Sequence, residues 1–527
     1  MSTDVADHED TYRAAGWWTG ERLIDRFEGL VKSGPGAIAL LSGNRTLTRA
    51  EFWELAGEWA GVLADEIEGD RQLVVIHLPN DVSWMAAFLA TMRAGHVPAT
   101  TPITTTAGHL LHIIGLTRPA AVVSCASHRG NSPLADVRDA VARADSSPGV
   151  LEATSDRLLA VASPGSGAVS EPVAEATDHI MFTSSTTGPP KAVSHRDDSL
   201  ATLNRQFADR FGLDDATALF MPSPLGHSVG AIHGARLALY LGAPLILQDE
   251  WDPVRALGLV GEHRAAFTAA ATPFLLDLLN AEWSEPEPKL APLRSFLCGG
   301  AQVPPALVER CREEFPQTFV TPLWGMTEGG LTTCAFDTAS ELVETTVGFA
   351  LPDLELAVIG DDGVQRSAGR GELVMRGPGV FNGYYGQPDL YAELTTGDGF
   401  FHTGDLAEID ASGFVSITGR LKDLIIRGGV NISPVYTENT IAAHPAVDGV
   451  AVIGWPDERL GERLCAVVQS TMPLGLEELK THCETDGLER RYWPERLEPV
   501  DGFPRTAAGK IRKQQLREDL LARLATP

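Results

Sequence analysis

The sequence predicts an α/β protein with a large N-terminal part and a smaller C-terminal domain. The chain has 527 residues, of which 44% are hydrophobic, so it can bury a large core in more than one folded unit. Strand-like runs alternate with helical patterns through roughly the first 400 residues, which is typical of helices layered on mainly parallel sheet. After Arg420 the pattern becomes more compact, and a boundary near residues 419–422 would leave a C-terminal domain of about 105 residues.

Local signals predict the first elements of the chain. Thr48 and Glu51 form a capping box, and apolar residues follow them at helical spacing, which predicts a helix. Those apolar residues are Phe52, Leu55, Trp59 and Leu63. Residues 73–78 predict a strand, and a second helix should extend up to Gly95.

Two segments are predicted to connect elements without regular structure of their own. Residues 145–176 are rich in Ser, Gly, Pro, Ala and Glu, which favours an exposed connection, and a strand should begin just after it at 180–182. A second polar loop lies near 284–288. The C-terminal domain should contain a turn at 428–429, a helix near 437–443, a strand at 449–453 and a final helix at 513–524.

Charge and composition restrict the class of function. The chain has 42 Lys and Arg against 70 Asp and Glu, and a net charge of −28 disfavours binding to nucleic acid or to an anionic membrane. No run of about 18 apolar residues predicts a transmembrane helix, and the acidic N-terminus is unlike a secretory signal. The scattered cysteines suit reduced thiols in a cytoplasmic protein and offer no metal site. They are Cys125, Cys298, Cys311, Cys334, Cys465 and Cys483.

A run of hydroxyl residues between a strand and a lysine is the most informative segment. The run is Thr183, Ser184, Ser185, Thr186 and Thr187, and Gly188, two prolines and Lys191 follow it. Hydroxyl and backbone N–H groups in such a loop can surround phosphate oxygens, and the lysine adds a compensating charge. The required glycine spacing is absent, so this is not a Walker A loop. The alternative is a surface turn rich in Ser and Thr.

This segment resembles the phosphate loop of the acyl-adenylate-forming superfamily, which includes acyl-CoA synthetases, aryl-acid AMP ligases, peptide-synthetase adenylation domains and luciferases. The family loop typically reads Thr-Ser-Gly-Thr-Thr-Gly-x-Pro-Lys-Gly, and here Ser185 and Ala192 stand where glycines are usual. The resemblance implies that residues 183–188 and Lys191 bind the phosphates of ATP.

A second match to the family covers residues 321–328. The family has an aromatic residue, glycine, any residue, threonine and glutamate where this chain has Trp324, Gly325, Met326, Thr327 and Glu328. The resemblance implies that Trp324, in place of the commoner tyrosine, stacks on adenine, that Thr327 donates to the α-phosphate and that Glu328 holds Mg²⁺. A core tryptophan beside a helix start is the alternative. Upstream, Gly299, Gly300 and Ala301 resemble the turn that contacts adenine.

The longest match runs from Phe401 through Gly419-Arg420-Leu421-Lys422-Asp423 to Pro434. The resemblance assigns the ribose hydroxyls to Asp405, the ribose and phosphate to Arg420, and the hinge between two domains to Lys422. Taken alone, Asp405 would suit a turn-forming residue. Tyr436 departs from the family, which usually has glutamate there, while Glu438 keeps the second acidic position. Related enzymes use this region to face the thiol acceptor.

The loop at 504–513 resembles the family's Pro-x-Thr-x-x-Gly-Lys loop, and the resemblance makes Lys510 the lysine that bridges the acid's carboxylate and the α-phosphate. An ammonium there would offset the charge that develops during attack on phosphorus. A solvated surface lysine is the alternative. His227, in the segment 224–230, resembles a residue that lines the acid pocket, and a core histidine is its alternative.

Taken together, the motifs imply a large N-terminal multi-subdomain α/β domain at 1–420 and a small mobile C-terminal α+β lid at 421–527. The implied activity converts a small-molecule carboxylic acid and ATP, with Mg²⁺, into acyl-AMP and pyrophosphate, then transfers the acyl group to coenzyme A. The alternatives are transfer to a carrier protein or an amine, activation of an inorganic acid such as nitrite in biosynthesis, γ-phosphoryl transfer, or a non-catalytic homologue. A homodimer is a habit of the family.

Overall fold

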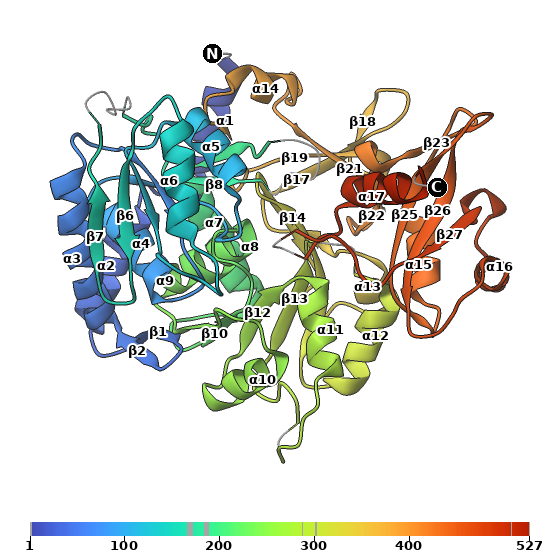
Figure 1. Cartoon of the computed structure of the whole chain (residues 1–527), viewed down its shortest axis with the longest axis horizontal. Helices are drawn as coiled ribbons and strands as arrows, with labels where there is room; N and C mark the ends of the chain where they lie inside the picture. The colour runs from blue at the N-terminus through green and yellow to red at the C-terminus, as the bar shows by residue number, and fades with distance from the viewer. Residues whose placement is uncertain are drawn as a thin grey trace.

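The computed structural model describes residues 3–165, 172–183, 189–286, 288–300, 303–506 and 509–525, except the side chains of residues 3–7 and 524–525. Figure 1 shows a large body formed by the blue, green and yellow parts of the chain, with the C-terminal part in red packed to one side. Within the described residues, no helix is both long enough and apolar enough to cross a membrane.

An eight-stranded sheet forms the first layer of the body, in the order β20-β9-β8-β4-β3-β5-β6-β7. Its central strands pair in parallel, and antiparallel strands close both edges. The strands are β3 (Leu73–His77), β4 (Val97–Thr100), β5 (Ala121–Ser124), β6 (Gly149–Ala153), β7 (Leu158–Ala162), β8 (His179–Phe182), β9 (Ala192–His195) and β20 (Gly383–Tyr384). The helices of this region are α1 (Thr3–Ala14), α2 (Leu23–Ser33), α3 (Arg49–Glu66), α4 (Val82–Arg93), α5 (Ala107–Thr117), α6 (Pro133–Arg143) and α7 (Asp197–Phe211).

A nine-stranded sheet forms the second layer, in the order β16-β15-β14-β13-β12-β10-β11-β1-β2, again with a parallel centre. Its strands are β1 (Ile38–Ser42), β2 (Arg45–Thr48), β10 (Leu219–Met221), β11 (Leu245–Leu247), β12 (Phe267–Ala270), β13 (Ser295–Gly299), β14 (Phe319–Met326), β15 (Gly329–Thr333) and β16 (Phe349–Ala350). The helices here are α8 (Ser228–Gly230), the π-helix η1 (Ala231–Arg236), α9 (Leu237–Leu241), α10 (Pro253–Glu262), α11 (Thr272–Asn280), α12 (Pro305–Glu314) and α13 (Ser340–Thr345).

A five-stranded antiparallel sheet follows, and it departs from the alternation of strands and helices predicted for this part of the sequence. Its order is β18-β17-β19-β21-β22, with α14 (Pro388–Glu393) between β20 and β21. The strands are β17 (Glu355–Ile359), β18 (Gln365–Arg366), β19 (Gly369–Arg376), β21 (Phe401–Ile409) and β22 (Val415–Arg420). Because short hairpins connect most of them, no crossover helices are needed.

The C-terminal part has its own sheet, in the order β24-β23-β26-β25 with β27 beside β26. Its elements are η2 (Leu421–Asp423), β23 (Ile425–Arg427), β24 (Val430–Ile432), α15 (Val435–Ala442), β25 (Val447–Asp457), β26 (Gly461–Ser470), α16 (Leu476–Thr485), η3 (Arg490–Tyr492), β27 (Arg496–Pro499) and α17 (Lys513–Ala525). The helix α17 buries Leu516 and Leu520 against this sheet. Lys513, Arg517 and Arg523 of the same helix form ion pairs with Glu438, Glu462 and Glu498.

Two local predictions have opposite outcomes. The capping box is confirmed: Thr48 and Glu51 satisfy each other's backbone at the start of α3, and the four apolar residues predicted to follow are buried. The prediction that residues 145–176 form only an exposed connection is wrong. Residues 149–153 pair with β5 as β6, and residues 158–162 return as β7. Hydrogen bonding and burial against the sheet outweigh the turn-rich composition around them.

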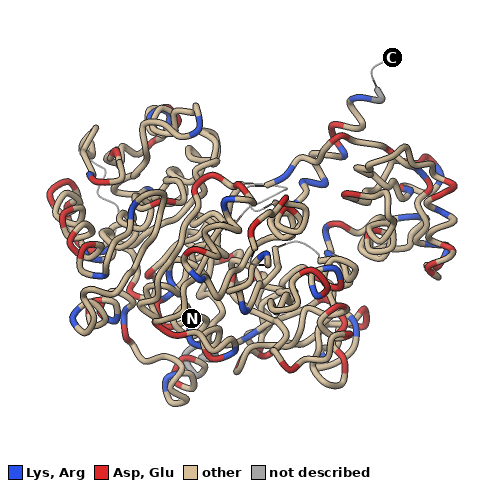
Figure 2. Tube along the Cα trace, turned by 90° about the horizontal axis from the view of Figure 1, so that it is seen from below, with Lys and Arg blue, Asp and Glu red and all other residues tan. Residues whose placement is uncertain are grey.

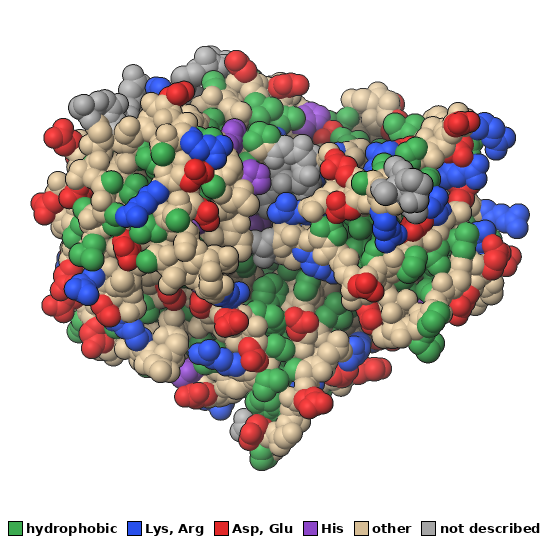
Figure 3. All heavy atoms as spheres, in the orientation of Figure 1, with side chains coloured by type: hydrophobic (Ala, Val, Ile, Leu, Met, Phe, Trp, Pro, Cys, Tyr) green, Lys and Arg blue, Asp and Glu red, His purple; other side chains and the backbone are tan. Residues whose placement is uncertain are grey.

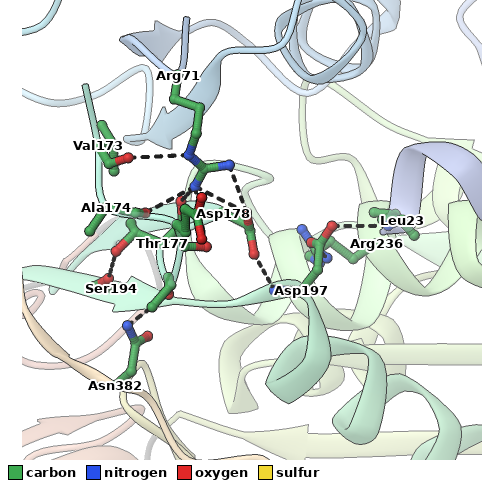
Figure 4. Close-up of polar contacts among 12 residues, drawn as sticks. Leu23, Arg71, Val173, Ala174, Thr177, Asp178, Ser194, Asp197, Arg236 and Asn382 are labelled. Carbon is green, nitrogen blue, oxygen red and sulfur yellow. Dashed lines mark hydrogen bonds and ion pairs between the residues drawn. The ribbon is translucent and has the colours of Figure 1, made fainter. Parts of the chain in front are cut away.

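A buried polar network joins α7 to the helical run formed by α8, η1 and α9 (Figure 4). Asp197 accepts a hydrogen bond from the backbone N–H of Leu23 at 2.9 Å and pairs with Arg236, which is 1% exposed. The backbone N–H of Asp197 donates to Asp178, which also pairs with Arg71. Breaking a buried pair of this kind typically costs about 3–5 kcal/mol. The network therefore ties the middle of the helical run, at the end of η1, to the start of α7 and to the first sheet.

The negative charge is unevenly divided along the chain. Residues 1–420 contain 28 Lys and Arg against 54 Asp and Glu, whereas residues 421–527 contain 14 against 16. Figure 2 shows Asp and Glu around the periphery of the large body and several Lys and Arg along the C-terminal helix. Figure 3 shows basic side chains gathered at the outer edge of the C-terminal part. Almost all of the excess negative charge therefore lies in the large body.

Candidate active site

At the base of the predicted phosphate loop, β8 and β9 pair in antiparallel fashion. The backbone N–H of Thr183 donates to the carbonyl of Lys191, and the N–H of Lys191 donates to Thr183 Oγ1, both at 3.1 Å. The Lys191 ammonium lies 4.9 Å from the centre of the Tyr384 ring. The predicted phosphate-binding residues Ser184, Ser185, Thr186, Thr187 and Gly188 lie outside the described residues.

Thr327 and Glu328 occupy the turn between β14 and β15, and both side chains are buried. His195 Nε2 lies 2.7 Å from the carbonyl oxygen of Thr327, which connects the end of β9 to this turn. The Tyr384 hydroxyl donates to Glu328 Oε1 at 2.7 Å. Burial raises the pKa of the Glu328 carboxyl, while the bond from Tyr384 and the charges of Lys191 and Lys510 oppose that shift.

Trp324, Asp405 and Arg420 form a second cluster beside this turn. Asp405 and Arg420 lie opposite each other on β21 and β22, and the Arg420 Nε is 2.7 Å from Asp405 Oδ1. The indole N–H of Trp324 donates to the other carboxylate oxygen, Oδ2, at 2.8 Å. Trp324 is 7% exposed and packs in a core cluster with Tyr384 and Met375. The stacking of adenine on this ring stays a prediction.

The predicted glycines lie where the backbone passes close to its neighbours. A β-carbon on Gly299 would lie 2.7 Å from the carbonyl oxygen of Leu323, and one on Gly325 would lie 2.7 Å from Leu331. Gly300 has a φ of +84° and directly faces the Lys510 side chain. The third residue of the predicted adenine turn, Ala301, lies outside the described residues.

Lys510 enters this site from the C-terminal part. Its backbone N–H donates to Thr506 Oγ1 at 3.1 Å, and its side chain is half-buried. Burial, together with the nearby charges of Arg420 and Lys422, lowers the pKa of Lys510 to about 8, and the charges of Asp405 and Glu328 oppose this shift. The loop that carries Lys510 rests on the body through Gly509, whose added β-carbon would lie 3.1 Å from Pro273.

His227 lies at the start of the helical run and faces the same site. It is buried, its Nδ1 accepts a hydrogen bond from the N–H of Val229 at 3.4 Å, and burial beside Lys510 lowers its pKa to about 3. His227 is therefore neutral at ordinary pH. The next residue, Ser228, accepts a hydrogen bond from Thr327 Oγ1 at 3.4 Å.

Two contributors to the site have no recognisable pattern in the sequence. Tyr384 and His195 are brought to Glu328 and Thr327 by strands far away in the chain. A tyrosine after a glycine and a lone histidine at a strand end are common in any α/β protein. Only the pairing of β9 with β20 places Tyr384 beside the lysine and the glutamate.

The region predicted to contain the hinge and to face the acceptor has mixed features. Lys422 lies exposed in η2, between the third sheet and the C-terminal sheet. The Tyr436 ring is half-buried and lies 5.0 Å from the ring of Tyr492. Glu438 accepts from the N–H of Val452 at 2.6 Å and pairs with Lys513 at 2.7 Å. Glu438 is thus occupied by contacts within the C-terminal part.

The donor set fits a magnesium ion that arrives with a nucleotide. Among the residues that the structure describes, no group of three or more His, Cys, Asp or Glu side chains is arranged to hold a metal. Glu328 is instead a single carboxylate beside two lysines. Mg²⁺ is commonly held by one or two carboxylates, water and the phosphates of its substrate, which is the arrangement that Glu328 could complete.

Comparison with known proteins gives a consistent picture. The family model described as AMP-binding enzyme matches residues 27–385, and the AMP-binding enzyme C-terminal domain matches residues 436–510. The medium-chain fatty-acid–CoA ligase of Escherichia coli is 35% identical over 66% of this chain and 61% of its own length. The salicyl-AMP ligase / salicyl-S-ArCP synthetase of Mycobacterium tuberculosis is 30% identical over 98% of this chain and 94% of its own.

Solved structures agree with the family match. ATP-bound MatB from Rhodopseudomonas palustris has a TM-score of 0.82 at 26% identity, covering 94% of this chain and 98% of its own, whereas the apo form of MatB has a TM-score of 0.72. The motifs, the two family matches and the large and small domains lead to one identification. The chain belongs to the AMP-binding enzyme family of the acyl-adenylate-forming superfamily and is an AMP-forming ligase that uses ATP to adenylate a small-molecule acid.

Proposed function

We propose that this enzyme makes an acyl-AMP from a carboxylic acid and then transfers the acyl group to the thiol of coenzyme A. The observation that carries the proposal is the convergence of Lys510 and Glu328 on one site. The lysine comes from the C-terminal part and the glutamate from the large body, and the charge of each affects the pKa of the other. A cation and a metal-binding carboxylate beside each other suit a reaction at a phosphate.

The nucleotide would lie along the two clusters of the site. Asp405 accepts the ribose hydroxyls, Arg420 contacts ribose and phosphate, and the turn at Gly299, Gly300 and Ala301 lies against adenine with Trp324. The loop from Thr183 to Gly188, with Lys191, surrounds the phosphates. The hydrogen bonds at the base of the loop support this assignment, since they hold Thr183 and Lys191 beside each other.

In the first step, a carboxylate oxygen of the acid attacks the α-phosphorus and the bond to pyrophosphate breaks. The Lys510 ammonium offsets the negative charge that develops, and the Thr327 hydroxyl donates to the α-phosphate. Glu328 would hold Mg²⁺, and the bound ion would neutralise charge on the phosphates. His227, neutral and buried, lines the acid pocket without adding a charge to it.

In the second step, the C-terminal lid at 421–527 turns about Lys422 relative to the domain at 1–420. The turn withdraws Lys510 and opens the mixed anhydride to the acceptor. The sulfur of the coenzyme A thiol attacks the acyl carbon, the bond from that carbon to the phosphate oxygen breaks, and AMP leaves while the thiol proton passes to solvent. Two observations support the boundary and the motion. The chain changes from the third sheet to the C-terminal sheet between Arg420 and Ile425. The chain as a whole is also more similar to ATP-bound MatB, with a TM-score of 0.82, than to apo MatB, with 0.72.

The similarity to a CoA ligase at 35% identity supports coenzyme A as the acceptor. A carrier protein is the second candidate, because the salicyl-activating relative matches along nearly the full chain. Tyr436 replaces the usual glutamate where the acceptor would approach, so an amine also belongs among the candidates to be tested. A homodimer stays a prediction.

The decisive experiment is a panel of aryl, alicyclic, medium-chain and amino-aryl acids and nitrite, incubated with ATP and Mg²⁺. AMP and pyrophosphate are measured with coenzyme A, with a carrier protein, with an amine and with no acceptor. Acid-dependent AMP that rises with coenzyme A and collapses in Lys510→Ala supports the proposal, with Lys480→Ala as a surface control. Acid-dependent AMP that responds only to a carrier protein or an amine overturns coenzyme A as acceptor. ADP in place of AMP would contradict adenylation itself.

A further inference from the structure

Trp324 has two features that a stacking surface alone does not require. The indole N–H of Trp324 donates a hydrogen bond to Asp405 Oδ2 at 2.8 Å. Trp324 is also nearly as buried as Asp405, with 7% of the tryptophan and 3% of the aspartate exposed. The remaining oxygen, Oδ1, is held by Arg420 at 2.7 Å. Each carboxylate oxygen thus has one protein donor, and each retains a lone pair that can accept another hydrogen bond.

The direction of this hydrogen bond fixes how the carboxylate faces its ligand. The backbone N–H of Asp405 donates to Thr403 Oγ1, so that contact restrains the main chain and leaves the carboxylate orientation to Trp324 and Arg420. Arg420 is 42% exposed at its side chain, whereas Trp324 is held within the core cluster. The rigid partner of the carboxylate is therefore the tryptophan.

We infer that Trp324 is a positioning residue for sugar recognition: its indole N–H orients the Asp405 carboxylate so that both oxygens accept the two ribose hydroxyls. This inference rests on the proposed function, because it assumes that Asp405 binds ribose. It adds a residue that sets the preference for ribonucleotide over deoxyribonucleotide. A tyrosine or phenylalanine here has an aromatic face but no N–H in this place.

The test compares ATP with 2′-deoxy-ATP and 3′-deoxy-ATP, using calorimetric binding in the presence of Mg²⁺ and the absence of any acid. The variant Trp324→Phe keeps an aromatic ring and removes the donor. Loss of one hydrogen bond to a charged group should weaken ATP binding about tenfold. The penalty for each missing hydroxyl should fall at the same time from about tenfold to about twofold.

The control is Trp59→Phe. Trp59 in α3 is 1% exposed, and its indole nitrogen has no hydrogen-bond partner among the described residues. This substitution changes core packing in the same way but should leave the preference for ribose intact. Thermal unfolding of both variants shows that each is folded at the temperature of the binding measurement.

A double-mutant cycle tests whether Trp324 acts through Asp405. In an Asp405→Asn background, Trp324→Phe should cost less than about twofold further in ATP affinity, because the group that it orients has lost its charge. An unchanged penalty for the deoxynucleotides in Trp324→Phe, or fully additive effects, would overturn this inference and leave the proposed function standing. Failure of the wild-type enzyme to bind ATP would overturn the proposed function as well.

Discussion

Glu328 and Lys510 bring opposite charges to one site, and the molecule holds them in different ways. Glu328 follows β14 of the large body, is 6% exposed and accepts a hydrogen bond from Tyr384. The backbone beside it is held in turn by His195. Lys510 stands on a loop of the C-terminal part, is half-buried, and has Thr506 as the acceptor of its backbone N–H.

The difference indicates which parts of the site serve each step. Groups fixed in the body, among them Glu328 and Asp405, are available to any chemistry that the nucleotide undergoes. A lysine on a separate domain is available only while that domain stays in place. We therefore predict that Lys510 contributes to the adenylation step and not to acyl transfer. The four experiments below test this assignment of groups to the two steps.

The largest effect is expected from Lys510→Ala. Removing the cation should slow adenylation by about 100-fold or more, as loss of a preorganised charge stabiliser typically does. Transfer of the acyl group from chemically supplied acyl-AMP should change less than about twofold. Pyrophosphate release and thioester formation measure the two steps separately, with Lys480→Ala as the surface control. Equal losses of rate in adenylation and in acyl transfer would contradict the assignment of Lys510 to adenylation alone.

Glu328 and Tyr384 should differ in the size of their effects. Glu328→Gln removes the charge that is proposed to hold Mg²⁺, so adenylation should fall about 100-fold and the Mg²⁺ concentration for half-saturation should rise. Tyr384→Phe keeps the carboxylate and removes one hydrogen bond to it, so the loss should be about tenfold. A Mg²⁺ titration of both variants measures this. A Tyr384→Phe enzyme as defective as Glu328→Gln would mean that the tyrosine acts on substrate directly.

Lys422→Pro should slow acyl transfer and leave adenylation nearly unchanged, which is the reverse of the effect expected for Lys510→Ala. Proline restricts the backbone rotation on which a hinge depends, so acyl transfer should slow about tenfold or more. Adenylation should stay within about twofold of the wild-type rate, because Lys510 already lies in the site. Single-turnover formation of acyl-AMP, followed by addition of the thiol, gives both rates. Unimpaired transfer would place the hinge elsewhere in the chain.

The smallest effect is a pH dependence that belongs to Lys510. Burial and neighbouring cations lower its pKa to about 8. The proposed mechanism requires the protonated form of Lys510. The kcat/KM for adenylation should therefore be constant below about pH 8 and decrease as the pH rises through that value. Lys510→Arg, which stays protonated, should move this fall to higher pH. A profile that is the same in the arginine variant would assign the titration to another group.

The sequence predicted those helices and strands that depend only on residues close together in the chain. The capping box of Thr48 and Glu51 and the apolar run at 73–78 depend on neighbouring residues only, and both elements are confirmed. The hairpin formed by β6 and β7 depends on pairing with β5, which no local pattern reveals. The same reason explains the antiparallel sheet between 355 and 420, in which most consecutive strands are joined by turns and not by crossover helices.

The site residues also divide into those that the sequence predicted and those that only the fold reveals. Contiguous motifs pointed to Thr327, Glu328, Asp405, Arg420 and Lys510, and the structure brings these residues together. Their catalytic roles stay predictions. Tyr384 and His195 could not be predicted, because their function depends on which strand lies beside which. The contact from Trp324 to Asp405 joins two motifs that the sequence presents as separate.

The uneven charge of the molecule has a consequence for how fast its substrates arrive. The large body carries 54 acidic against 28 basic residues, and the nucleotide and the acid substrate are themselves anions. Long-range repulsion therefore slows their diffusional encounter with the site, and mobile ions that screen the field relieve it. Salt should thus accelerate nucleotide association with this enzyme over the range in which the Debye length shrinks from about 30 Å to about 10 Å.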